Sequence, residues 1–370
     1  MKKNISHFLI SLNIFFIFII FLTFLSSFLN YKHIYAESNS TLSGYYYTSN
    51  IEHLFTHCLI AYPEIAFAKN NHMSKHYATD CITAKEFVKI LNELHDNDYV
   101  LININNCYTL DKDNQVIKRK VKVPIGKKPL ILSFDDVNYD SKKIGLGMVD
   151  KIIIDKDNNL ASSTKINNKE HISYDNEFIP ILENFIKLNP DFSIDNAKGV
   201  INLTGYDGIL GYRTSHTNTT NRMEEIEKAQ KVVNVLKENG WQFACHSYGH
   251  YHMNKITDEK FAQEIFSWKN EVEPIIGKTS IYVYPFGEWQ VFENGNICKK
   301  HKMLQDAGFK LFCGVGMKSF FSYLPNKTHK VLFKDRKCVD GRTLSQNNIE
   351  LNKFFNPLNI LDAKRNILTK

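Results

Sequence analysis

The chain has 370 residues, 43% of them hydrophobic and 23% charged, and a formal net charge of +7. This length suffices for one large catalytic domain or two ordinary ones, and the composition is typical of a chain with a packed core, not of a disordered one. There is no basic stripe with interleaved aromatic residues, so the charge does not indicate nucleic acid binding. The seven cysteines lack CxxC spacing, which excludes a zinc finger.

Residues 1–36 have the pattern of an export segment. Lys2 and Lys3 precede an apolar run from about Phe8 to Phe28 that contains no charge, and a small residue, Ala36, follows. A cleaved signal peptide shows this pattern, but roughly 20 apolar residues also suffice for a retained transmembrane anchor. Both alternatives export the remaining chain, so we expect a secreted protein or one anchored at the outer face of a bacterial plasma membrane.

The rest of the chain alternates strand-like apolar runs with helix-like amphipathic runs, which is typical of an α/β fold with parallel strands. We expect a linker at 37–50, a single catalytic domain at 51–347 and a C-terminal tail at 348–370. Residues 138–173, rich in Lys, Asp and Asn, are expected to form an inserted loop or small hairpin. Strands are predicted at 54–61, 99–104, 129–134, 199–203, 241–245, 280–284 and 309–315, and helices at 83–97, 177–188, 223–239, 258–276 and 299–307.

Two adjacent carboxylates, Asp135 and Asp136, follow the strand predicted at 129–134. Consecutive residues of a strand point to opposite sides, and burial of both charges is unfavourable unless a cation or a proton neutralises the site. The pair therefore indicates a metal or catalytic site, although a solvated acidic turn would contain the same residues.

Two histidines follow the strand predicted at 241–245, in the run His246-Ser-Tyr-Gly-His250. If the backbone turns helically here, the two imidazoles converge on one side. Two imidazoles and one carboxylate are a common ligand set for a divalent metal, with positions left open for water and substrate. HxxxH alone is a weak signal, but the preceding strand and the aspartate pair strengthen it.

The run Tyr284-Pro-Phe-Gly287 ends a further predicted strand. Proline fixes the chain direction and glycine lets the backbone approach a ligand closely, so a backbone N–H near Phe286 could face a developing oxyanion. Taken alone, the run would be interpreted as a plain turn.

In this order, the three motifs resemble those of the polysaccharide deacetylases with a NodB-homology domain, carbohydrate esterase family 4. The resemblance extends over about residues 83–315: Ser133–Asp136 is similar to the first motif of the family, His246–His250 to the second and Tyr284–Gly287 to the third. It implies a distorted (β/α) barrel of the NodB-homology type.

The resemblance also implies roles for the site residues: Asp136, His246 and His250 bind a divalent metal, and Asp135 is the catalytic base. Zinc is the expected metal, although this ligand set would accept cobalt, nickel or manganese. The upstream residues 55–99 are loosely similar to the branch that deacetylates poly-N-acetylglucosamine exopolysaccharide, which would place His57 at the rim of the site.

Two features depart from the family pattern. The arginine that usually begins the third motif and orients the base is replaced by Val283, and Arg336 or Arg213 could take its place. The usual Leu-x-His motif that supplies the catalytic acid is missing after residue 316. His57 is the candidate acid, because a histidine in an apolar strand needs a reason to be there; a core histidine bonded to backbone is the alternative.

We therefore expect metal-dependent N-deacetylation of an acetylated amino-sugar polymer, either cell-wall peptidoglycan or poly-N-acetylglucosamine, with the glycan as the only macromolecular partner predicted. One alternative is a catalytically impaired pseudoenzyme of the same fold that binds carbohydrate. Another is a hydrolase that cleaves a different acyl or amide bond at the same site.

Overall fold

The computed structural model describes residues 44–166, 169–288, 292–293, 296–316, 321–325 and 330–367. The predicted export segment 1–36 lies outside these ranges. Within them, no helix is both long enough and apolar enough to cross a membrane. The chain divides into two compact units, of which the smaller contains strands β1 (Gly44–Tyr46) and β6 (Lys122–Pro124), paired antiparallel.

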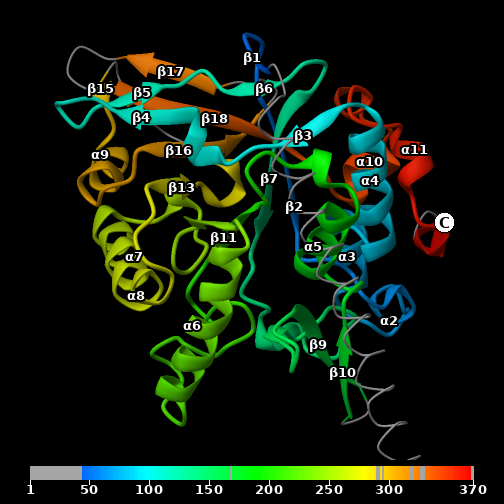
Figure 1. Ribbon diagram of the computed structural model, residues 1–370. Helices are drawn as coiled ribbons and strands as arrows, with labels where there is room; N and C mark the ends of the chain where they lie inside the picture. The colour runs from blue at the N-terminus through cyan, green and yellow to red at the C-terminus, as the bar shows by residue number, and fades with distance from the viewer. Residues whose placement is uncertain are drawn as a thin grey trace, which may run out of the picture. The chain divides into compact units, whose positions relative to one another are not determined.

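The larger unit is built on seven parallel strands that close into a barrel (Figure 1). They follow one another around the barrel in chain order, and the last pairs with the first. Because each neighbour runs parallel, all seven carboxyl ends meet at the same end of the barrel. The strands are β2 (Glu52–His57), β7 (Lys128–Asp135), β11 (Val200–Leu203), β12 (Gln242–Cys245), β13 (Ile281–Val283), β16 (Leu311–Val315) and β18 (Lys330–Cys338). The predicted (β/α) barrel is thus confirmed.

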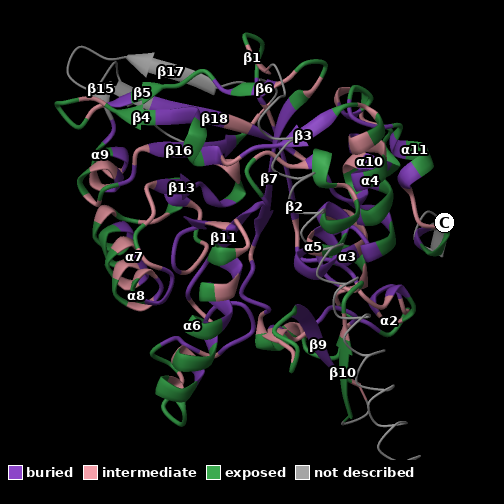
Figure 2. Cartoon of the chain, in the orientation of Figure 1, coloured by how far each residue is buried: buried purple, intermediate pink, exposed green. Residues whose placement is uncertain are grey.

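Helices connect the successive barrel strands from β2 to β16, as expected for parallel neighbours, whereas strand β17 (Phe321–Pro325) lies between β16 and β18 in the chain. Figure 2 shows buried residues along the strands and exposed residues on the outer faces of the helices. The helices are α2 (Pro63–Ala66), α3 (Ser74–Asp80), α4 (Ala84–Asp96), α5 (Phe178–Leu188), α6 (Arg222–Glu238), α7 (Asp258–Glu271), α8 (Glu273–Ile276), α9 (Lys299–Asp306), α10 (Gly341–Ser345) and α11 (Pro357–Ile360).

Local sequence explains where these helices begin and end. Thr83 caps α4 as predicted: its hydroxyl accepts from the Glu86 N–H at 3.1 Å, and the Glu86 carboxylate accepts from the Thr83 N–H at 2.7 Å. Helix α6 ends before Gly240, whose φ of +95° is a conformation that a Cβ would disfavour.

The remaining strands are not part of the closed barrel. The insertion at 138–173 is larger than the predicted hairpin, because β8 (Lys151–Ile154), β9 (Leu160–Ile166) and β10 (Lys169–Ser173) form a three-stranded antiparallel sheet. The other strands are β3 (Tyr99–Leu101), β4 (Tyr108–Leu110), β5 (Val116–Lys118), β14 (Phe292–Glu293), β15 (Asn296–Ile297) and β17 (Phe321–Pro325). The first predicted strand ends at His57 and not at Ala61, since the Leu59 N–H bonds the Glu177 carboxylate instead of a neighbouring strand.

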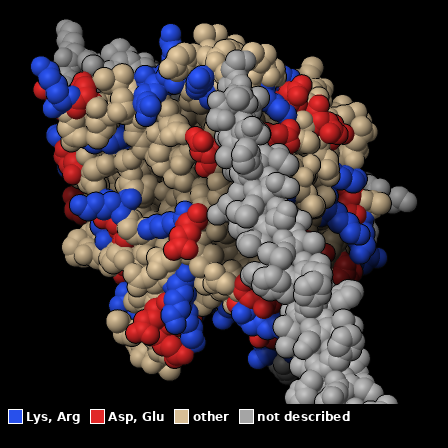
Figure 3. All heavy atoms as spheres, viewed as in Figure 1, with Lys and Arg blue, Asp and Glu red and all other residues tan. Residues whose placement is uncertain are grey.

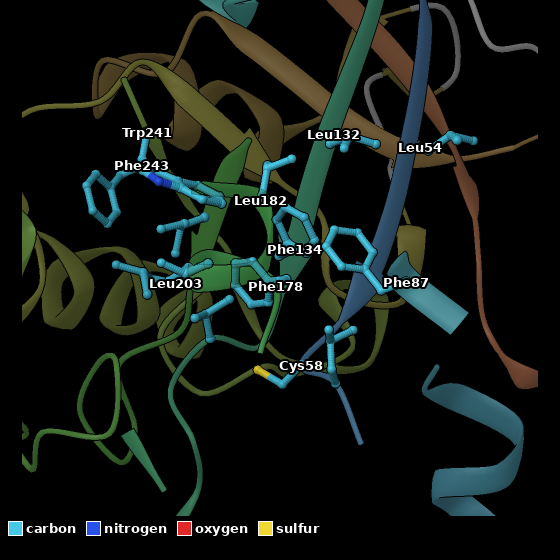
Figure 4. Close-up of a cluster of buried hydrophobic side chains, with 14 of the residues drawn as sticks. Leu54, Cys58, Phe87, Leu132, Phe134, Phe178, Leu182, Leu203, Trp241 and Phe243 are labelled. Carbon is cyan, nitrogen blue, oxygen red and sulfur yellow. The ribbon is translucent and has the colours of Figure 1, made fainter. Parts of the chain in front are cut away.

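Aromatic packing supports the strand that delivers the aspartate pair (Figure 4). Phe134, at the end of β7, stacks on Phe178 of α5 with ring centroids 3.8 Å apart, and Trp241 packs beside both rings. Phe87 of α4 meets Phe134 edge-on from the other side. These rings fix the strand end from which Asp135 emerges. Cys245 and Cys313 are buried in barrel strands.

Candidate active site at the carboxyl end of the barrel

The predicted metal ligands meet where β7 and β12 end. The Asp136 Oδ1 atom lies 3.6 Å from His250 Nε2 and 3.9 Å from His246 Nε2. All three atoms lie within 4.8 Å of one another, and they form the one such group of histidine, cysteine or acidic side chains found among the described residues. Two strands that are distant in sequence therefore bring these side chains together.

The backbone turns sharply at Asp136. Residues of a continuing strand would point Asp135 and Asp136 to opposite sides, which was the expectation from sequence. Instead β7 ends at Asp135, and Asp136 adopts a left-handed φ of +58°. Both carboxylates consequently face His246, whose Nε2 atom lies 3.6 Å from Asp135 Oδ2 as well.

The loop that carries the two histidines is not helical, so the expected helical turn is wrong. Ser247 and His250 both have left-handed φ values, +62° and +54°. The buried Glu264 of α7 stabilises this loop, because its Oε2 atom accepts from the Ser247 hydroxyl at 3.0 Å and from the Gly249 N–H. The imidazoles converge through this turn and not through the i, i+4 spacing of a helix.

The three side chains fit a divalent cation. The Nδ1–H of His246 donates to the Val283 carbonyl at 2.9 Å, which leaves the Nε2 lone pair facing the site. Burial lowers the pKa of His250 to about 4, so its imidazole is neutral at physiological pH and can act as a ligand. Asp136 Oδ1 is buried and receives no hydrogen bond, as expected for an oxygen that serves as a metal ligand.

Arg336 of β18 holds Asp135. Its guanidinium donates from Nη1 to Oδ1 at 2.7 Å and from Nη2 to Oδ2 at 3.0 Å, and the Asn202 amide donates to Oδ1 at 2.6 Å. Burial alone would raise the pKa of Asp135, but the charge and hydrogen bonds of Arg336, together with the neighbouring His246 and His57, hold that pKa well below its usual range. Of the two arginines considered from sequence, Arg336 is therefore the one that contacts Asp135, the predicted base.

The other arginine lies elsewhere. Arg213 donates to the Asp207 carboxylate at 2.8 Å and to the Tyr139 carbonyl at 2.7 Å, and so joins the loops that follow β7 and β11. Its role in this structure is to connect loops, and its guanidinium bonds groups other than Asp135.

Phe286 lies beside the histidines, in the 3₁₀ turn Pro285–Gly287, with a φ of +58°. Its ring stacks on His252 with centroids 3.8 Å apart and meets His250 edge-on at 4.5 Å. The side chain remains 52% exposed, so an aromatic face is available next to the predicted metal ligands.

His57 ends β2, directly opposite Asp135 in the parallel pairing of β2 with β7. Paired residues of neighbouring strands point to the same face, so the side chains of His57 and Asp135 lie on the same side of the sheet. Its Nδ1 atom lies 2.9 Å from the Asp80 carbonyl oxygen. The structure thus places His57 at the edge of the site, as expected.

The sequence did not identify two residues that support the site, Asn202 and Glu264. Asn202 interrupts an apolar strand, and Glu264 lies on the buried face of α7 between Phe261 and Trp268. A polar side chain in an apolar pattern was the available signal in both cases, because a buried polar group needs a partner. Their partners, Asp135 and the histidine loop, could not be identified without the fold.

Comparison with known proteins identifies a family whose model covers part of this site. Residues 213–304 match the family model of the polysaccharide deacetylases, a range that contains the histidine motif and Phe286 but not the aspartate pair. The resemblance seen in the sequence is therefore confirmed over residues 213–304, which match a polysaccharide deacetylase domain. Such domains hydrolyse the acetamide groups of N-acetylated sugars. None of the curated proteins matches the chain.

Solved structures that resemble this one include two deacetylases and IcaB. Deacetylase PplD from Streptococcus pyogenes is 14% identical, with a TM-score of 0.45 over 81% of this chain and 98% of that one. IcaB from Ammonifex degensii is 11% identical, with a TM-score of 0.42 over 81% and 95%. BC0361, a polysaccharide deacetylase from Bacillus cereus, is 12% identical, with a TM-score of 0.41 over 80% and 68%.

Proposed function

We propose that this protein removes acetyl groups from the amino sugars of a glycan polymer by metal-dependent hydrolysis. The observation that carries the proposal is the convergence of Asp136, His246 and His250 beside an aspartate that Arg336 holds in place. Zinc fits a set of two imidazoles and one carboxylate best. When bound by these residues, the metal supplies Lewis-acid chemistry at the acetyl group.

The protein's own groups have distinct roles in this reaction. Asp135, kept ionised by Arg336, takes a proton from the attacking water. The backbone N–H of Phe286 faces the oxyanion that develops on the acetyl oxygen. His57, in its imidazolium form, delivers the Nε2 proton to the amine nitrogen as the bond to the acetyl carbon breaks. Acetate and a free sugar amine are the products.

Acetate release from N-acetylglucosamine oligomers and from peptidoglycan fragments tests the proposal and separates the two candidate polymers. The Asp135→Asn variant is the control, because it keeps the shape of the side chain and removes the base. Release by the native chain but not by this variant supports the proposal. Oligomer binding with no release from any substrate would instead favour the carbohydrate-binding pseudoenzyme.

We also propose that the domain works outside the cell, where its polymeric substrate lies. The support is the charged head and uncharged apolar run of residues 1–36. Protease treatment of intact cells, with immunoblotting of cells and medium, measures this. A protein that is fully protected in intact cells, with none in the medium, would contradict the proposal.

Basic and acidic side chains are interspersed on the face of the protein that Figure 3 shows. That distribution suits a neutral or weakly charged glycan, because no extended field of one sign covers the visible part of this face.

A further inference from the structure

The hydrogen bond of His57 defines how its ring is oriented. A carbonyl oxygen can only accept, so the Nδ1 atom that lies 2.9 Å from the Asp80 oxygen carries the proton. This contact selects one tautomer and leaves Nε2 for the active site. Residues 80–83 run alongside the end of β2, with the Ile60 N–H bonded to the Ile82 carbonyl at 2.9 Å. The orientation of the imidazole therefore depends on where this segment lies.

Arg365 holds that segment from the C-terminal end of the chain. It lies in the 3₁₀ turn Ala363–Ile367 and is only 5% exposed. Its Nη1 donates to the Ala78 carbonyl at 2.8 Å and its Nη2 to the Cys81 carbonyl at 2.6 Å. These two carbonyls lie on either side of Asp80, so the guanidinium fixes the backbone that carries the acceptor of His57.

Glu86 fixes the guanidinium in turn. This fully buried carboxylate accepts from Arg365 Nε at 2.6 Å and from Nη2 at 2.7 Å, a two-pronged pairing with little rotational freedom. Gly341 completes the arrangement, since a Cβ there would lie 1.9 Å from the Ala78 oxygen. Burial of an ion pair adds little net stability by itself. The observed geometry does, however, determine where the backbone at Asp80 lies.

We propose that Arg365 is a positioning residue for His57: by holding the carbonyls on both sides of Asp80, it keeps the Nδ1–H on the Asp80 carbonyl. Nε2 then faces the active site, where it takes up a proton from solvent and, as part of the imidazolium, delivers that proton. The inference rests on the proposed deacetylation, in which His57 is the acid. It makes residues near the end of the chain part of the support of the active site.

The test uses Arg365→Lys and Glu86→Gln in the full chain. A lysine can still meet Glu86 but cannot bind both carbonyls at once, and glutamine keeps the size of Glu86 without its charge. The matched control is Lys364→Met, because the neighbouring Lys364 forms only an exposed ion pair with Glu64 at 3.1 Å. We expect each test variant to lower kcat at least about 10-fold, a fraction of what a positioned acid contributes, with KM and metal content unchanged.

The ¹⁵N shifts of the His57 ring report the tautomer directly, and its signals are assigned by their loss in His57→Gln. At a pH at which the ring is neutral, the Nδ1–H form should predominate in the native chain and in the control and decline in both test variants. An unchanged tautomer together with native kcat in both variants overturns the proposal. The spectra need no substrate, so a tautomer that shifts in a chain without deacetylase activity supports the positioning contact while the proposed function fails.

Discussion

Replacing Arg336 with methionine should separate the role of the base from the role of the metal. The guanidinium is fully buried and makes two charged hydrogen bonds to Asp135, of 2.7 and 3.0 Å. Its removal leaves a buried carboxylate without a counter-charge, which costs about 3–5 kcal/mol of unfolding free energy. The base also loses its orientation, so turnover should fall roughly 100- to 10,000-fold. Metal content should stay unchanged, because Arg336 contacts none of the three predicted ligands.

Urea unfolding and acetate release per folded molecule measure these two effects. Arg213→Met is the matched control, since it removes a partly buried arginine that pairs with Asp207 and not with Asp135. If Arg336 acts through Asp135, adding Arg336→Met to Asp135→Asn should cause no further loss of turnover. Native turnover in folded, metal-loaded Arg336→Met would refute the reasoning, as would fully additive losses in the double variant.

Two further predictions concern histidines. The His57→Gln variant should lose at least about 100-fold in turnover with unchanged metal content, as expected for loss of a positioned acid; a variant that is only less stable would leave His57 as a core histidine. Burial lowers the pKa of His301, which bonds the Tyr284 hydroxyl, to about 4. The unfolded chain therefore binds the extra proton first, and unfolding free energy should fall by up to about 3 kcal/mol as pH drops from about 6.5 to about 4. Urea titrations across this range should show a smaller decline in His301→Phe, and an identical decline would contradict the assignment.

Much of the fold follows from local patterns. The capping box at Thr83, the glycine after α6 and the apolar run of β7 predict elements within a few residues of those observed. Each signal is local, because caps, left-handed glycines and apolar runs act over one or two turns of chain. The alternation of helix and strand then predicts parallel strands, and the resemblance to the deacetylase family implies the barrel.

The contacts between residues distant in sequence could not be predicted, because they depend on closure of the barrel. Arg336 and Asp135 are 201 residues apart and meet only because β18 pairs with β2. The sequence alone therefore gave no reason to prefer Arg336 over Arg213 as the partner of Asp135. The left-handed turns at Asp136 and His250 also escaped prediction. No glycine marks these positions, and the surrounding loops impose the conformation.

Metal content of the His250→Ala variant tests the central claim most directly. The native chain should hold about one divalent metal at the site of Asp136, His246 and His250, as expected for a set of three protein ligands. His95→Ala is the control, since His95 lies near the end of α4 and pairs with the exposed Asp191. Elemental analysis with parallel acetate-release assays should show that His250→Ala loses most of the metal and the activity while the control keeps both. Stoichiometric metal in a folded His250→Ala chain would contradict the assigned site.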